Sequence, residues 1–488
     1  MSLTLPRGAT RTEAPSPPSL ALPMSLIVLV TVGWALMLNN GVFIDESLYI
    51  RAGRAYLDHW LAGTPLPADV GTGFSGLPML YPVLAAALDM VGGLALVRAF
   101  SLLCVVATMF VLRAITAHLF TRRAGLVAAA MYGLTGPVLY IGHLGTFDAV
   151  VILMLSVALW LGLTRSTWAV VLLIGPLLAL TVATKFTAYV FVPPILVLIT
   201  FNRYALARSI ELRRWRPRPD WDRVFRSLLI GVCTVGLLTA AYAGAGDVAR
   251  EGLAFTTTER KALSPASTGW LVAQVPDYVW PMFFAALLGT VFLGVARRWT
   301  AVVFAIGLLG TALLLPVAQI KLGEAVSFQK HLAYSAMFLA PLAGWGFARP
   351  WRLAIWTPVL VWWLILVGMW GMFRSHDLIA YPDVRPVVQE LEFGPGEHLS
   401  SSAESLAYYT LSDPSVVWQP TSGLYAQGPD AVEEAIEQQR FATVVIHAGA
   451  TGSTIQDEGQ QVLLDALEDS DYTRTDLGEE DQWLVYRR

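Results

Sequence analysis

Residues 25–49 read SLIVLVTVGWALMLNNGVFIDESLY, and this stretch decides the fold. Its apolar part lacks a small-residue cleavage pattern, so it predicts a first membrane span that is retained. The stretch then ends in two adjacent carboxylates, Asp45 and Glu46. Because charge at the edge of lipid is costly unless it has a function, the pair predicts a site at the membrane–water boundary.

The composition is that of a polytopic membrane protein. The 488 residues are 55% hydrophobic and only 14% charged, with a mean hydropathy of +0.57. A soluble domain carries about 25% charged residues. Further apolar runs of spanning length recur along the chain, so the fold class is an α-helical membrane bundle.

Charge divides the chain into parts. Residues 374–488 contain 21 Asp and Glu against 6 Arg, whereas the preceding residues carry an excess of positive charge. This contrast predicts a transmembrane domain over 24–373 and a soluble domain over 374–488. Residues 1–23 are rich in Pro, Ser and Ala and are typical of a disordered tail.

The arginines orient the spans, because positive residues in short loops favour the cytoplasmic side. Placing Arg122 and Arg123 inside, together with the arginine-rich loop 202–226, fixes one alternation with a cytoplasmic N-terminus and an external C-terminal domain. The loop is better explained as an orientation signal than as a nucleic-acid site. About 11 spans result: 25–42, 97–118, 125–141, 148–163, 168–184, 187–201, 227–246, 277–296, 300–320, 331–348 and 353–373.

The segment between the first two spans is predicted to lie outside the membrane. Residues 43–76 form a charged loop, and 77–94 contain Asp89 and two prolines. A helix lying at the outer surface suits 77–94 better than a further span. We also expect loop 247–276 to be external and long enough to act as a lid.

This topology gathers basic residues at the outer face, against the positive-inside trend. All four lysines of the chain lie there, with several arginines: Lys185, Lys261, Lys321, Lys330, Arg51, Arg54, Arg98, Arg250 and Arg260. Single residues of this kind are explained by side chains that reach out of the lipid at helix ends. As a group beside Asp45, Glu46 and Asp148, they predict a site for an anionic substrate.

Six motifs in chain order resemble those of the GT-C superfamily of membrane glycosyltransferases, in its aminoarabinose-transferase-like and protein-mannosyltransferase-like branch. They cover residues 25–350: Asp45-Glu46-Ser-Leu-Tyr49, Leu77-Pro78-Met79-Leu80-Tyr81-Pro82, Arg98, His143-Leu-Gly-Thr-Phe-Asp148, Thr184-Lys185, and Lys330-His331-Leu-Ala-Tyr334 with Pro341. One departure is Gly76-Leu77, where the family often has a lysine before the prolines; Arg51 or Arg54 is a possible replacement.

The resemblance implies a glycosyltransferase that moves a sugar from a polyprenyl monophosphate to an acceptor hydroxyl at the outer face, with inversion. A hydroxyl needs a general base, and we assign Asp45, with Glu46 orienting it; the reverse order stays open. Asp148 is predicted to support the cations or the acceptor, although a helix cap explains it too. For Arg98 an interfacial anchor is the alternative. The predicted phosphate-binding cations are Arg98, Lys185, Lys330, Arg260 and Lys261.

Tyr49, Tyr81, His143 and His331 are the candidate contacts to acceptor or sugar, although such histidines are more often satisfied polar residues near helix ends. No metal-ligand spacing is present, and we expect no metal and no cofactor. The partners expected are the lipid-linked donor, a glycan, lipid or protein acceptor and membrane lipids, without nucleic acid. The sugar, the acceptor and the oligomeric state are open.

The C-terminal domain alternates helical and strand patterns. Helices are predicted at 431–439 and 463–467 and strands at 442–447 and 482–486, which indicates a small α/β domain. A secondary transporter or a lipid-linked-substrate binding protein is the alternative function. Two similar halves and matched broken spans, which many transporters have, are not evident.

Overall fold

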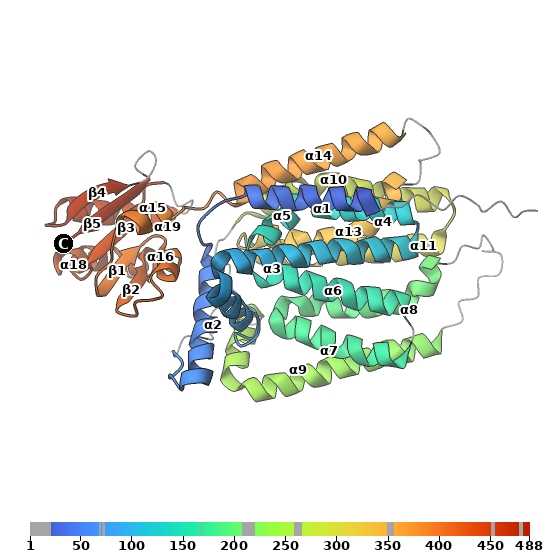
Figure 1. The fold of residues 1–488 in the computed structure, drawn as a ribbon, viewed down its shortest axis with the longest axis horizontal. Helices are drawn as coiled ribbons and strands as arrows, with labels where there is room; N and C mark the ends of the chain where they lie inside the picture. The colour runs from blue at the N-terminus through green and yellow to red at the C-terminus, as the bar shows by residue number, and fades with distance from the viewer. Residues whose placement is uncertain are drawn as a thin grey trace, which may run out of the picture.

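The computed structural model describes residues 21–67, 70, 74–165, 167–206, 220–257, 266–348, 356–449, 454–477 and 482–488. A helical bundle forms the larger part, and a small α/β domain lies beyond one end of it (Figure 1). We call this the domain end of the bundle.

The bundle is built mainly from helices that run back and forth along one direction, whereas α2 lies across the domain end (Figure 1). Their bounds are α1 Ala21–Met37, α2 Ile44–Ala62, α3 Tyr81–Leu119, α4 Arg122–Gly133, α5 Gly136–His143, α6 Phe147–Thr164, α7 Trp168–Thr184, η1 Phe186–Phe191, α8 Val192–Leu206, α9 Trp221–Thr256, α10 Thr268–Val295, α11 Trp299–Ala312, α12 Leu314–Leu322, α13 Phe328–Ala348 and α14 Trp356–Leu378.

Helix α13 is at the centre of the bundle and is buried along almost its whole length. Small residues let its neighbours approach closely. A Cβ added to Gly344 would lie 2.3 Å from the carbonyl oxygen of Ala124 in α4, and one on Gly289 in α10 would lie 2.2 Å from that of Leu342. Larger side chains at these two glycines would push α4 and α10 away from α13.

The chain is a multi-pass membrane protein. Among the described residues, six helices are long and apolar enough to span a membrane, and the bent pair α4 and α5 would make a seventh. Helices α1 and α7 and residues 186–201 are apolar but shorter. Each of the eleven predicted spans coincides largely with described helix, but the number that cross the membrane stays a prediction.

Two segments that the sequence places outside the membrane differ from the expectation. Residues 44–62 form helix α2 instead of a loop, with buried positions at 46, 49, 50, 53 and 56. These positions have the spacing of one helix face. The helix was not predicted because the charged residues on its opposite face indicated a loop. The expected surface helix over 77–94 begins at Tyr81 and is separated from the following span by non-helical backbone at Gly92 and Gly93.

The predicted lid over 247–276 is largely wrong. Helix α9 continues to Thr256, with a break at Gly246, and α10 begins at Thr268. Helix α10 starts at Thr268 because Ser267 caps its N-terminus: the Ser267 hydroxyl accepts a hydrogen bond from the Trp270 amide at 3.2 Å. Within this segment, residues 258–265, with Arg260 and Lys261, lie outside the described residues.

The α/β domain follows α14, which ends at Leu378, four residues after the predicted boundary at 374. Its elements are α15 Arg385–Glu390, β1 Gly396–Ser400, α16 Ala403–Tyr409, β2 Val416–Pro420, α17 Thr421–Tyr425, α18 Pro429–Glu437, β3 Thr443–His447, α19 Thr454–Glu468, β4 Thr473–Leu477 and β5 Trp483–Arg487. The sheet order is β2-β1-β3-β5-β4, with β1, β2 and β3 parallel and β5 antiparallel to β3 and β4.

Helix α16 docks this domain onto the bundle. Glu404 pairs with Arg51 of α2 at 2.5 Å, and its carbonyl accepts from the Ser47 hydroxyl. The Tyr408 hydroxyl donates to Asp89 at 2.7 Å, and Asp89 also pairs with Arg54. Burial and this carboxylate raise the pKa of Tyr408, which therefore stays a neutral donor. Asp89 thus joins α2, α3 and the α/β domain.

The orientation in the membrane is a prediction with a direct test. In a background with both native cysteines replaced, Arg122→Cys should resist an impermeant maleimide added to intact cells, whereas His59→Cys should react. Both positions are exposed, at opposite ends of the bundle. Efficient labelling at 122 from outside would show that the alternation is inverted.

Candidate functional site

The acidic pair lies in the first turn of α2, at the domain end, and its two carboxylates have different surroundings. Asp45 forms an ion pair with Lys330 of α13, and its side chain is 28% exposed while that of Lys330 is 4% exposed. The Lys330 ammonium also lies 4.6 Å from the centre of the Phe43 ring. Asp45 is therefore the carboxylate of the pair that substrate and water can reach.

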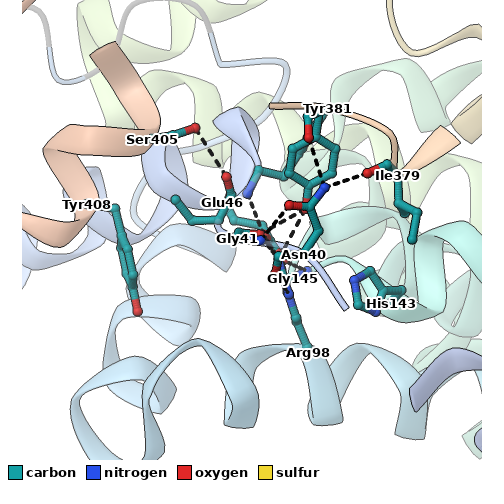
Figure 2. A network of polar contacts seen from close by, with 12 residues as sticks. Asn40, Gly41, Glu46, Arg98, His143, Gly145, Ile379, Tyr381, Ser405 and Tyr408 are labelled. Carbon is teal, nitrogen blue, oxygen red and sulfur yellow. Dashed lines mark hydrogen bonds and ion pairs between the residues drawn. The ribbon is translucent and has the colours of Figure 1, made fainter. Parts of the chain in front are cut away.

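Glu46 is fully buried and is satisfied by four donors. Arg98 of α3 donates from Nε at 2.9 Å and from Nη2 at 2.7 Å, and the amides of Gly145 and Phe43 donate at 2.6 and 2.8 Å. Figure 2 shows Arg98 reaching Glu46 from the helix beneath. Gly145 must be small, because a Cβ there would lie 2.7 Å from Val97 and 3.2 Å from Glu46. Glu46 thus holds α2, α3 and the α5–α6 connection together.

The segments before α2 and after α14 complete this network (Figure 2). Arg98 also donates to the carbonyls of Asn40 and Gly41, at 2.9 and 2.6 Å. The Asn40 amide donates to the carbonyls of Ile379 and Tyr381, and the Tyr381 hydroxyl donates to Gly41 at 2.9 Å. Burial and the Glu46 carboxylate raise the pKa of Tyr381, so the phenol remains a donor.

A second ion pair is buried beside the first. Lys185 follows the last residue of α7, and Asp148 lies in the first turn of α6; the Nζ–Oδ1 distance is 2.5 Å, with side chains 4% and 1% exposed. The Tyr334 hydroxyl donates to the same Asp148 oxygen at 3.0 Å. Asp148 is not the N-cap of α6, since Thr146 takes that position. The two charges compensate each other in a site closed to water.

Helix α13 connects the two pairs through consecutive residues. Lys330 contacts Asp45, and His331 Nε2 lies 3.2 Å from Lys185 Nζ. His331 Nδ1 lies 2.7 Å from Gln319 Oε1, and because that oxygen only accepts, the ring proton is assigned to Nδ1 and Nε2 accepts from Lys185. One helix therefore presents the Lys330 cation to one ion pair and the neutral His331 ring to the other.

Aromatic rings pack under the cations. Tyr49 lies 4.9 Å from Phe147 and 5.6 Å from Tyr81 between ring centres, and Lys185 lies 4.8 Å from the Phe147 ring centre. These rings form an apolar floor that excludes water and strengthens the electrostatic interactions above it.

The structure brings together Asp45, Glu46, Asp148, Lys185 and Lys330, with Tyr49, Tyr81 and His331 around them. Arg98 is among them, but its guanidinium is committed to Glu46 and to main-chain carbonyls. We therefore interpret Arg98 as a positioning residue and no longer as a phosphate ligand.

His143 is buried near α1, with Nδ1 3.2 Å from the Ala35 carbonyl, and is a packing residue in this arrangement. Arg260 and Lys261 lie outside the described residues. Among the residues that the structure describes, no group of three or more His, Cys, Asp or Glu could hold a metal ion.

Sequence reasoning missed Asn40, Gln319 and Tyr381. Asn40 could have been predicted, because a polar residue at the end of an apolar run needs hydrogen-bond partners. Gln319 and Tyr381 contact the site from distant parts of the chain, and nothing local distinguishes them.

The chain is similar to known glycosyltransferases in one sequence segment and in fold. Residues 78–216 match the family model "Dolichyl-phosphate-mannose-protein mannosyltransferase", a segment that contains Arg98, Asp148 and Lys185 but neither Asp45 nor Lys330. No curated protein matches the chain by sequence.

Two solved structures illustrate the likeness in fold. ArnT from Cupriavidus metallidurans bound to undecaprenyl phosphate has a TM-score of 0.58 at 13% identity, covering 96% of this chain and 97% of that one. The oligosaccharyltransferase from Archaeoglobus fulgidus, complexed with zinc and sulfate, has a TM-score of 0.53 at 12% identity. The match covers 87% of this chain and 68% of that one. The chain therefore has the GT-C fold, and its resemblance to the ArnT/PMT-like family of GT-C glycosyltransferases is confirmed.

Proposed function

We propose that this protein is a glycosyltransferase that moves a sugar from a polyprenyl monophosphate to an acceptor hydroxyl at the outer face of the membrane. The observation that carries the proposal is the pair of lysines at the domain end of the bundle, each buried against an aspartate. The ArnT-like fold, seen in a relative with undecaprenyl phosphate bound, and the mannosyltransferase-like segment support it.

The reaction needs a base, an electrophile and a stabilised leaving group. The acceptor oxygen attacks the anomeric carbon while its proton passes to an Asp45 carboxylate oxygen. The bond between that carbon and the phosphate oxygen breaks, and its electrons stay on the phosphate, whose charge grows. Attack opposite the leaving phosphate inverts the anomeric centre. Lysines already fixed in a partly dry site stabilise that charge without reorganisation.

The ion pair between Asp45 and Lys330 couples donor binding to base activation. In the structure, each neutralises the other. A donor phosphate that takes Lys330 as its counter-ion leaves the Asp45 carboxylate free to accept a proton. Asp45 is the more exposed partner, so it can turn toward the acceptor while Lys330 stays buried.

The test is donor consumption by purified protein in proteoliposomes. Vesicles with polyprenyl-phosphate-linked mannose, glucose, arabinose or aminoarabinose, supplied with glycan, lipid and peptide acceptors, should form a glycosylated acceptor and release polyprenyl phosphate only when protein is present. Donor transport without cleavage of the sugar–phosphate bond would exclude the transferase and favour a carrier.

Lys330→Met should weaken donor binding by about 10- to 100-fold, the range for a lost hydrogen bond to a charged group of roughly 1.5–3 kcal/mol. Folding should survive, because Asp45 is partly exposed and remains solvated. Lys321→Met, at an exposed lysine near the end of α12, is the matched control and should bind donor normally. Equal donor affinity in both variants would make Lys330 an anchor only.

Lys185→Met has a further consequence, because it leaves the buried Asp148 without its cation. We therefore expect reduced folded yield as well as low turnover, since an uncompensated buried charge is strongly destabilising. The double variant Lys185→Met/Asp148→Asn removes that charge and should recover yield but not turnover. Turnover that recovers together with yield would limit Lys185 to a structural role.

A further inference from the structure

The carboxyl ends of the three parallel strands of the α/β domain meet at one edge of the sheet. Strand β1 is followed by Ser401, β2 by Thr421 and β3 ends at His447. The chain leaves β1 toward β2 on one side and reaches β3 on the other. Open α/β sheets bind ligands in the crevice at such a switch point, because the loops diverge there.

A groove of about 430 Å³ lies at this edge, between the α/β domain and the start of α2. The domain side is formed by residues that follow the strands and by Gln456 and Gln460 of α19; Phe43, Ile44 and Tyr381 form the opposite side. Pockets of roughly 300–1,000 Å³ are typical of small-molecule sites.

The groove leads to the proposed catalytic site. Phe43 forms part of its wall, and the Lys330 ammonium lies 4.6 Å from the centre of the Phe43 ring. Ile44, which also lines the groove, directly precedes Asp45 in α2. Ser422 and Gln456 are exposed, so the groove is open to solvent.

The lining suits a neutral, hydroxyl-rich ligand. Among the described residues that line the groove, Glu404 is the one acid, and it is paired with Arg51; lysine and arginine are absent there. Hydroxyls and amides both donate and accept, as sugar hydroxyls do. The rings of Phe43, Tyr381 and Tyr425 offer flat apolar faces beside them.

His447 adds a defined donor. The Gly449 amide donates to its Nδ1 at 3.2 Å, which assigns the ring proton to Nε2. Burial lowers the pKa of His447, so the ring is neutral at neutral pH. The Ser401 hydroxyl accepts from the His447 amide at 3.0 Å, and its own proton is left for a ligand.

We infer that this groove binds the acceptor and that the acceptor is a neutral carbohydrate, held between the switch point of the α/β domain and α2 with one hydroxyl directed toward Asp45. The inference rests on the proposed function for the acceptor role. The carbohydrate class rests on the groove itself.

The test measures binding without any donor. Saturation-transfer NMR on the full chain in lipid nanodiscs is carried out with cellobiose, lactose, glucose 6-phosphate and a neutral threonine tripeptide. The neutral disaccharides should show transfer. Gln456→Trp and Ser422→Trp, which fill the groove from α19 and α17, should reduce it by about tenfold or more.

Gln461→Trp is the matched control, because Gln461 is exposed on α19 but does not line the groove. It should keep wild-type disaccharide binding. Absence of disaccharide binding in the wild type, preference for the phosphorylated sugar or the tripeptide, or equal binding in Gln456→Trp would each overturn the carbohydrate assignment.

A second measurement separates this inference from the proposed function. Where sugar transfer is measured in proteoliposomes, Gln456→Trp should raise the acceptor KM by about tenfold or more without changing donor affinity. An unchanged acceptor KM would remove the groove from the reaction while leaving the transferase intact. Disaccharide binding without any donor cleavage would instead contradict the transferase and retain the sugar site.

Discussion

Asp45→Asn should lower the rate of sugar transfer by about 10²–10⁴-fold, the usual cost of removing a general base. The amide keeps the size of the side chain and one acceptor oxygen for Lys330, but it cannot take the acceptor's proton. Donor affinity should stay at the wild-type value or rise, because Lys330 loses its competing carboxylate. Transfer rate and donor affinity are measured on the same proteoliposomes.

Asp58→Asn provides the matched control for this variant. Asp58 is an exposed carboxylate on the same helix, so the substitution should leave both quantities unchanged. Near-normal transfer by Asp45→Asn would remove Asp45 as the base. If Glu46→Gln then loses transfer at normal stability and donor affinity, the roles of the two carboxylates are reversed.

Patterns that extend over many residues carried the fold prediction. Long apolar runs made the bundle predictable, and the helices and strands expected around 431–439, 442–447, 463–467 and 482–486 appear as α18, β3, α19 and β5. Helix α2 was missed because its charged face hides the helical spacing of its buried residues. The charged residues within 43–76 predict a loop, whereas an interfacial helix also exposes one charged face.

The sequence was enough to predict which residues form the site, but not which role each of them has. Asp45, Asp148, Lys185 and Lys330 were identifiable because charges are costly near lipid. Adjacent positions in a helix point about 100° apart, so Asp45 faces Lys330 and Glu46 faces Arg98. Only the packing of α3 against α2 shows which carboxylate is buried, and that contact joins residues 52 positions apart.

The docking of the α/β domain could not be read from sequence. Tyr408, Glu404 and Ser405 in α16 contact α2, α3 and the segment before α2 through single hydrogen bonds and one ion pair. Such contacts leave no periodic pattern in the chain. Most of the described acidic residues of this domain are exposed, so its negative charge does not indicate where it docks.

Glu46→Gln should reduce stability far more than Asp45→Asn does. Glu46 is fully buried and accepts from four donors, two on each carboxylate oxygen. An amide has one accepting oxygen, so in either orientation its NH₂ group meets two donors. Arg98 is then left buried without its counter-charge, and breaking a buried pair in this way costs about 3–5 kcal/mol.

Glu404→Gln is the control that shows how much of the loss of stability in Glu46→Gln comes from burial of the ion pair. Glu404 also pairs with an arginine, but its side chain is 28% exposed and that of Arg51 is 40% exposed. An exposed pair contributes roughly 0–1 kcal/mol, so this variant should unfold near the wild-type temperature. Thermal unfolding of the purified proteins in one detergent measures the difference. If Glu46→Gln is as stable as Glu404→Gln, the Glu46–Arg98 contact does not hold the domain end of the bundle together.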